Sequence, residues 1–440
     1  MPYGRPPFRH TSQHALRQIT VFFRHTSQHA LRQPPLFSPT PPVMPRGRAG
    51  LWSPALSNRS AHLPFFLTWI GAERWPMGAR RSRAGANGGG GAGQSGEWRQ
   101  RRRRMDAERE IRQLQKAKAK AQRGGHAVEE AALCNQLGEI LASHGRYEEA
   151  LEEHREELRL LEGAGDRLGC AIAHRKIGER LAELERYGAA LQHQEQHLEL
   201  ARALGDHTEQ QRAWATLGRT HMFIGESGEE PGALDEAQRA FHTSLAIVEE
   251  RLEGWVPRRE VLEMKARLFL NLALVSDCRK EPELRERYLR RSIFLAEQGG
   301  LQEDLYRAHF NRGSILLRDG DHGGALRSLS RARESARSLR DRALESESCA
   351  SSARVFLALG DFAAARRSLR QAHALGPRQP RHRHQVRADL RYATRMLRLL
   401  QALEGAGGDA AAALPLCEQL GDACSRRGDY GRALGFYQRQ

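Results

Sequence analysis

His193 and His197 stand four residues apart within the sequence HQEQH, a spacing that could place two imidazoles on one helix face. Zinc is often held by histidines spaced in this way. The stretch lacks the His-Glu-x-x-His order of zinc hydrolases, and no third ligand is placed nearby. We therefore interpret both histidines as part of an ordinary helix surface and expect no metal.

Other reactive residue types are equally unpromising for catalysis. Cys417 and Cys424 are seven residues apart at positions that suit helix packing, and the spacings of the six cysteines fit no zinc or redox template. The glycine run at 88–91 lacks the lysine and hydroxyl residue of a phosphate loop, and the basic RHRH at 381–384 is interpreted as a solvated loop. We predict no catalytic residue, no cofactor and no enzyme activity.

The formal charge of +17 is unevenly distributed along the 440 residues. Residues 1–104 hold 17 arginines, no lysine and two acids, whereas residues 105–440 hold 53 basic and 51 acidic residues. The first segment also contains FRHTSQHALRQ twice and has no stretch with helical or strand periodicity, so we expect it to be disordered. The change in composition at Met105 favours that methionine as the physiological first residue.

A Trp-x-x-Leu-Gly spacing at residues 212–218, RAWATLG, is typical of the opening of a tetratricopeptide unit. Small residues recur at the position of its glycine, with steps of 40, 40, 55, 40, 40 and 68 residues. A further small residue follows most of these markers twelve positions later, where it would let the two helices of a unit touch. The markers are Gly138, Gly178, Gly218, Ala273, Gly313, Ala353 and Gly421, and the later positions are Ala150, Ala190, Ala325, Ala365 and Ala433.

These patterns predict an all-α fold, a tetratricopeptide-repeat superhelical solenoid with a disordered amino-terminal leader. Asp166, Asp206 and Asp341 precede first helices and should cap them, and unit three needs about seven inserted residues around 225–232. We expect a leader over 1–104, a capping helix over 105–125, repeats one to six over 126–378, a divergent helical linker over 379–408 and a truncated repeat seven over 409–440. Because repeat seven would leave an apolar face uncovered, we expect the chain to be a fragment.

The first helix of each unit should line the concave side of the array, where such proteins take extended or helical peptides. Arginine suits carboxylates there, and asparagine suits a peptide backbone. The alternative is that arginine merely tolerates exposed helix sites, because the chain has 64 arginines and six lysines. The candidate groove residues are Arg175, Lys176, Arg212, Arg219, Arg267, Asn271, Arg307, Asn311 and Arg354.

Several strings are more specific than the generic repeat, and they resemble the amino-terminal region of the tonsoku-like family. The resemblance covers residues 105–440 and none of residues 1–104. The strings are REIRQLQKAKAKAQR (109–123), EEAALCNQLGE (129–139), AHRKIGERLAE (173–183), QRAWATLGRTH (211–221), SIFLAEQ (292–298) and CEQLGD (417–422).

The resemblance implies a non-enzymatic scaffold of the nucleus, at chromatin and replication forks, with the cytoplasm as a second compartment. It implies a role in replication-fork maintenance and recombination-dependent repair of DNA double-strand breaks, with the repeats recruiting replication and histone-chaperone factors. A large helical recombination partner would belong to the full-length family member, and no membrane or sequence-specific nucleic acid is expected. The alternative is a Leu-Gly-Asn-like cytosolic adaptor for spindle orientation or signalling, although the asparagine after Leu-Gly is missing at residues 179 and 219.

Overall fold

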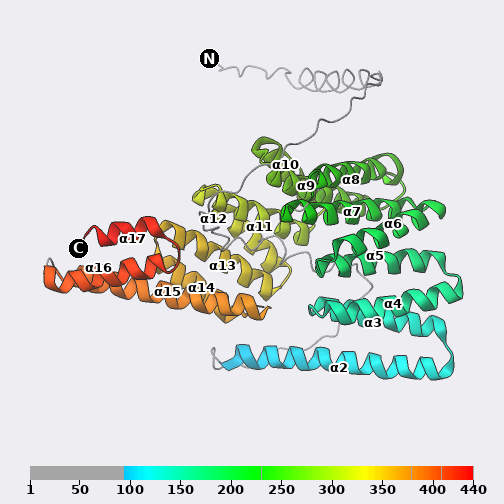
Figure 1. Cartoon of the computed structure of the whole chain (residues 1–440), viewed down its shortest axis with the longest axis horizontal. Coiled ribbons are helices and arrows are strands. Elements are labelled where there is room, and N and C mark those ends of the chain that lie inside the picture. The colour runs from blue at the N-terminus through cyan, green and yellow to red at the C-terminus, as the bar shows by residue number, and fades with distance from the viewer. Residues whose placement is uncertain (1–93, 229, 378, 408, 440) are drawn as a thin grey trace, which may run out of the picture. The chain divides into compact units, whose positions relative to one another are not determined.

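The computed structural model describes residues 94–228, 230–377, 379–407 and 409–439, and describes side chains from Glu108 onward. Within this part the chain forms sixteen α-helices and one short π-helical turn. Consecutive helices pair into antiparallel hairpins that follow one another in chain order (Figure 1). The predicted all-α tetratricopeptide array is confirmed. Of the disordered leader predicted over residues 1–104, residues 1–93 lie outside the described residues, and the prediction is wrong for residues 94–104, which are helical.

Six hairpins, a single long helix and a seventh hairpin follow the first helix. The helices are α2 (Gln94–Gly124), α3 (Ala127–Ser143), α4 (Tyr147–Ala164), α5 (Arg167–Glu183), α6 (Tyr187–Ala203), α7 (His207–Ser227), α8 (Ala233–Ile247), η1 (Val248–Leu252), α9 (Arg258–Cys278), α10 (Pro282–Gln298), α11 (Gln302–Arg318), α12 (His322–Ser338), α13 (Arg342–Leu359), α14 (Phe362–Leu375), α15 (Pro380–Gly405), α16 (Ala410–Ser425) and α17 (Tyr430–Tyr437).

Aspartate side chains begin many of these helices, as predicted. Asp166 accepts a hydrogen bond from the amide of Gly169, and Asp206 and Asp341 each accept two from the amides of their first turns. Four more aspartates cap in the same way at α12, α14, α16 and α17. An amide at a helix start has no partner within the helix, so each cap satisfies a donor that would otherwise be unpaired.

Glycine at the marker position lets the two helices of a hairpin approach closely. A methyl group added to Gly138 would lie 2.5 Å from the ring of His154, and one added to Gly218 would lie 2.7 Å from the ring of Phe241. A methyl group added to Gly178 would lie 3.1 Å from the backbone oxygen of Ala190. The role predicted for the marker residues is therefore confirmed by the packing around them.

The two irregular steps of the repeat have different structural causes. In unit three α7 continues to Ser227, and the loop to α8 contains Gly228 and Gly232 with left-handed backbone angles. The π-helical turn and a short loop between α8 and α9 complete this step of 55 residues. The step of 68 residues instead contains one additional helix, α15, between α14 and α16. The extra residues thus lengthen connections or add a helix, and they leave the hairpins paired.

Two boundaries differ from the sequence-based expectation. Helix α2 begins at Gln94, eleven residues before the predicted start of the capping helix at Met105. The RHRH segment at 381–384 is the beginning of α15 and is not a loop. Proline is favoured in the first turn of a helix because it has no amide hydrogen to leave unpaired, and Pro380 occupies that place in α15.

Buried apolar side chains run through the array as a series of clusters. One of the larger clusters joins helices α7 to α11 and includes Phe241, Leu268 and Leu272. Another joins helices α13 to α17 and includes Leu369, Met396 and Leu420. Among the described residues no helix is long and apolar enough to span a membrane.

Candidate functional site

The first helices of successive hairpins form one continuous surface. Helix α7 contacts both α5 and α9, and α11 contacts both α9 and α13, in addition to the contacts within each hairpin. Side chains that point away from the second helices of the hairpins can therefore meet across neighbouring units. All nine candidate groove residues lie on these five helices.

A cleft of about 50 Å³ between α7 and α9 brings four of the predicted residues together. Arg212 and Arg219 come from α7, and Arg267 and Asn271 come from α9. The remaining lining is mixed, with acidic, hydroxyl, amide and apolar side chains. These residues are Gln211, Ala215, Thr216, Glu260, Glu263, Met264 and Leu268.

The arginines of this cleft are paired with carboxylates of the same chain. Arg212 pairs with Glu209 one turn earlier in α7. Nη2 of Arg219 lies 3.4 Å from Oε1 of Glu179, on α5. The cleft therefore contains guanidinium groups whose charge is already balanced within the protein, and it is less basic than the arginines alone suggest.

The pairing continues into the next unit. Nε of Arg267 donates to Oδ1 of Asp304 at 2.9 Å, and a second ion pair joins Arg267 to Glu263. Arg307 pairs with Glu303 at 2.6 Å and with Asp304 at 3.8 Å. Acidic and basic side chains thus alternate along the surface of the first helices.

Asn311 and Arg354 also form hydrogen bonds within their own helices. The Asn311 amide donates to the carbonyl of Arg307 at 2.9 Å, which leaves its oxygen and one N–H for a ligand. Arg354 donates to the hydroxyl of Ser351 at 2.8 Å. Burial lowers the pKa of Arg354 to about 10, which leaves the guanidinium charged at neutral pH.

Arg175 and Lys176 lie in the interior of the array. Each side chain is 8% exposed, and Lys176 donates to Asn135 of α3 at 2.5 Å and to Glu157 of α4 at 3.4 Å. A charge in such a place is tolerated only with close partners. Lys176 therefore joins units one and two, and the structure places it apart from the cleft.

The two histidines of the HQEQH segment have structural partners. His197 is fully buried, so its interpretation as helix surface is wrong, and its Nε2 lies 2.9 Å from Oε2 of Glu209. Burial would raise the pKa of Glu209, but the hydrogen bond with His197 and the charges of Arg175 and Arg212 lower it to about 2. The ionised Glu209 thus links α6 to α5 and α7.

His193 has a different partner from its neighbour in sequence. Its Nδ1 lies 2.9 Å from Nδ1 of His174 on α5, and burial lowers the pKa of His174 to about 4. The pair can therefore share a hydrogen bond as neutral rings. No group of three potential metal ligands occurs among the residues that the structure describes.

The carboxylates that neutralise the groove were not predicted from the sequence. Glu209, Glu263 and Glu303 each stand three or four residues before an arginine of the candidate groove. That spacing is the one at which opposite charges meet on a helix, so the signal was present in the sequence. The contacts of Glu179 and Asp304 with neighbouring units depend on the packing of the array.

Comparison with known proteins gives matches of two kinds. A tetratricopeptide-repeat family model matches residues 128–203, and a second such model matches residues 416–440. Tonsoku-like protein of Mus musculus is 52% identical over 321 residues, which are 73% of this chain and 24% of that protein. Tonsoku-like protein of Drosophila melanogaster is 28% identical over 328 residues, or 72% of this chain and 23% of that protein. The chain spans about a quarter of the length of these curated relatives.

Solved structures with similar folds are more distant. A Rap protein complexed with competence and sporulation factor is 14% identical with a TM-score of 0.47, and the match covers 71% of this chain and 74% of that one. A tetratricopeptide repeat protein from Parabacteroides merdae is 15% identical with a TM-score of 0.40, over 64% of this chain and 98% of that one.

Proposed function

This chain is a homologue of the tonsoku-like proteins, a segment of that family with tetratricopeptide repeats, and on that premise we propose that it is a non-enzymatic scaffold in replication-fork maintenance and recombination-dependent repair. Its repeats recruit replication and histone-handling proteins in the nucleus. The observation that carries the proposal is the 52% identity over 321 residues, which are 73% of this chain. Nuclear localisation and the partners of the whole relatives belong to the same proposal.

The recruiting surface in this proposal is the cleft between α7 and α9 with its extension along α11. Its alternating charges favour a partner segment that carries both signs or presents its backbone, because an acidic segment would compete with Glu179, Glu263 and Asp304. The Asn271 amide can hydrogen-bond to a peptide, and Ala215 and Met264 supply apolar contact.

Replacing arginines of the groove by glutamate would be a poor test, because each new carboxylate would lie beside an existing one. A milder groove variant combines Arg212→Gln, Arg219→Gln and Asn271→Ala. The matched control combines Arg239→Gln and Arg290→Gln, two exposed arginines of second helices that also form ion pairs within their own helices.

The test compares the full chain and both variants in cells under replication stress, with helix content and thermal midpoint measured on the purified proteins. We expect nuclear foci at sites of labelled nascent DNA for the parent and the control, and about a tenfold loss of foci for the groove variant at unchanged helix content. Foci that persist in the groove variant would contradict the recruiting role of the cleft. Cortical staining in mitosis without nuclear foci would instead support the adaptor alternative.

A further inference from the structure

A second charged surface lies away from the cleft, on α14 and α15. Residues 362–403 hold ten arginines and a single acid, Asp389, whereas residues 105–440 as a whole are close to neutral. Asp389 is buried, and it binds Arg427 at 2.6 Å and Gln385 at 2.9 Å. It therefore holds α15 against the turn between α16 and α17 and does not neutralise the surface.

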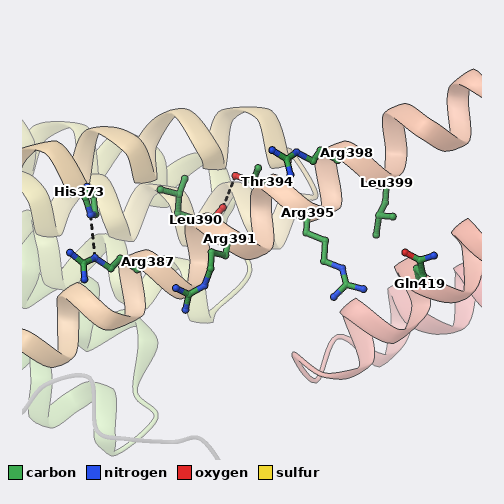
Figure 2. A pocket seen from close by; sticks show the side chains of 9 residues that line it. All are labelled: His373, Arg387, Leu390, Arg391, Thr394, Arg395, Arg398, Leu399 and Gln419. Carbon is green, nitrogen blue, oxygen red and sulfur yellow. Dashed lines mark hydrogen bonds between the residues drawn. The ribbon is translucent and has the colours of Figure 1, made fainter. Parts of the chain in front are cut away.

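Four of these arginines follow one side of α15 at positions 387, 391, 395 and 398. They line a hollow of about 620 Å³ bounded by α14, α15 and α16 (Figure 2). Steps of four, four and three residues keep side chains on one face of a helix, and the rise of about 1.5 Å per residue spreads them over about 16 Å. We call this set of side chains, Arg387, Arg391, Arg395 and Arg398, the arginine face.

The floor of the hollow carries apolar and uncharged polar side chains. Leu390 and Leu399 come from α15, and Gln419 comes from α16. Figure 2 shows Arg391, Arg395 and Leu399 extending from α15 toward the side on which Gln419 lies. At the other end Arg387 donates to Nε2 of His373 at 3.3 Å, which joins the face to α14.

The charge of three of these four arginines is left unbalanced, in contrast to the paired arginines of the first helices. Arg391, Arg395 and Arg398 are exposed, and within the described part of the chain they form no ion pair and no side-chain hydrogen bond. Like charges three or four residues apart repel each other and destabilise a helix. The face thus costs stability, and an anionic ligand would remove that cost.

We propose that the hollow binds an acidic segment of a partner protein, with carboxylates on the arginine face and apolar side chains against Leu390 and Leu399. Guanidinium and carboxylate form paired, directional hydrogen bonds, so several arginines in a row favour a chain of carboxylates. A span of about 16 Å accommodates about five extended residues or three helical turns.

The lining of the hollow favours a peptide over a nucleic acid. Single-stranded nucleic acids are held by bases stacked on aromatic rings, and none of the nine residues that line the hollow is phenylalanine, tyrosine or tryptophan. A floor of leucine side chains matches the apolar residues of an amphipathic peptide instead. This site is separate from the cleft between α7 and α9, so the two can be tested independently.

The experiment measures binding of a fluorescent peptide of about eleven residues, in which leucines at helical spacing are flanked by glutamates, to the full chain. A second peptide has glutamine in place of every glutamate, and a third probe is an oligothymidine of about twelve nucleotides. We expect the glutamate peptide to bind at least about tenfold more tightly than either of the other probes, with an affinity that falls as salt rises.

The arginine-face variant combines Arg391→Gln, Arg395→Gln and Arg398→Gln. Its matched control changes three exposed arginines of the second helices and combines Arg239→Gln, Arg290→Gln and Arg331→Gln. We expect a loss of about tenfold or more for the face variant and less than about twofold for the control. Gln419→Glu retains every arginine but supplies a carboxylate within the hollow that competes for them. We therefore expect it to weaken binding of the glutamate peptide by about threefold or more.

Three results would overturn the proposal. The first is equal affinity for the glutamate and glutamine peptides. The second is tighter binding of oligothymidine that the face variant abolishes, which would assign the hollow to nucleic acid. The third is unchanged peptide binding in a folded face variant and in Gln419→Glu.

Discussion

At the scale of single residues, buried charge distinguishes side chains that stabilise the array from those that oppose its stability. Ionised Glu209 is surrounded by His197, Arg175 and Arg212, and its pKa is lowered. For Glu226 of α7, none of the described groups that shift its pKa is a cation. Burial and the charge of Asp277 raise the pKa of Glu226 to about 7, although the thiol of Cys278, 3.7 Å away, donates a hydrogen bond to it.

The raised pKa of Glu226 predicts a pH-dependent effect of Glu226→Gln. The folded protein binds this proton more tightly than the unfolded chain does, because the pKa of Glu226 in the unfolded chain is near 4.5. The stabilisation by protonated Glu226 is therefore lost as pH rises through about 7. Glutamine carries no charge, so we expect the variant to be more stable than the parent at pH 8 by about 1–3 kcal/mol and equal to it near pH 4.5.

Urea denaturation at pH 5 and pH 8 measures this difference. Glu152→Gln is the control, because Glu152 is exposed and its replacement should have the same small effect at both pH values. A Glu226→Gln variant whose advantage does not change between the two pH values would contradict the assignment.

At the scale of the helices, close approach within each hairpin depends on the marker glycines. Gly218→Ala would drive a methyl group into the ring of Phe241, so we expect a loss of about 1–3 kcal/mol in spite of the better helix propensity of alanine. Gly188 of α6 is exposed and has no atom within 4 Å of an added methyl group, so Gly188→Ala should be neutral or stabilising by up to about 1 kcal/mol.

Thermal denaturation followed by circular dichroism compares the two variants. We expect a lower midpoint for Gly218→Ala and an unchanged or higher midpoint for Gly188→Ala. An increase for both would show that the contact between α7 and α8 adjusts freely.

The aspartate caps and marker residues behave as their local sequence predicts, because both act over a few residues or within one hairpin. The start of α2 was not predicted, since boundaries set by composition do not follow helix ends.

At the scale of the whole molecule, stability should be a sum of local terms between neighbouring hairpins. Leu137 is fully buried in a cluster shared by α2, α3 and α4, and Leu369 is fully buried in the cluster of α13 to α17. Replacing either by alanine should cost about 2–5 kcal/mol at its own site.

Hydrogen exchange tests whether the effect remains local. We expect Leu137→Ala to lower amide protection in α2 to α5 while α11 to α17 stay unchanged, and Leu369→Ala to produce the reverse pattern. Each variant is the control for the other. A loss of protection along the entire array in either variant would show that the units unfold as one.

The sequence alone determined the helical array, its seven hairpins and the glycine and aspartate positions that build them, because these depend on residues a few positions apart or on one repeated contact. It also placed the candidate groove residues on the first helices. Tertiary structure decided which charges are balanced, since Glu179 and Asp304 reach their arginines across neighbouring units. It likewise buried Lys176 and His197 and left Arg391, Arg395 and Arg398 exposed, because the choice between an interior and an open face depends on the element that packs against each helix.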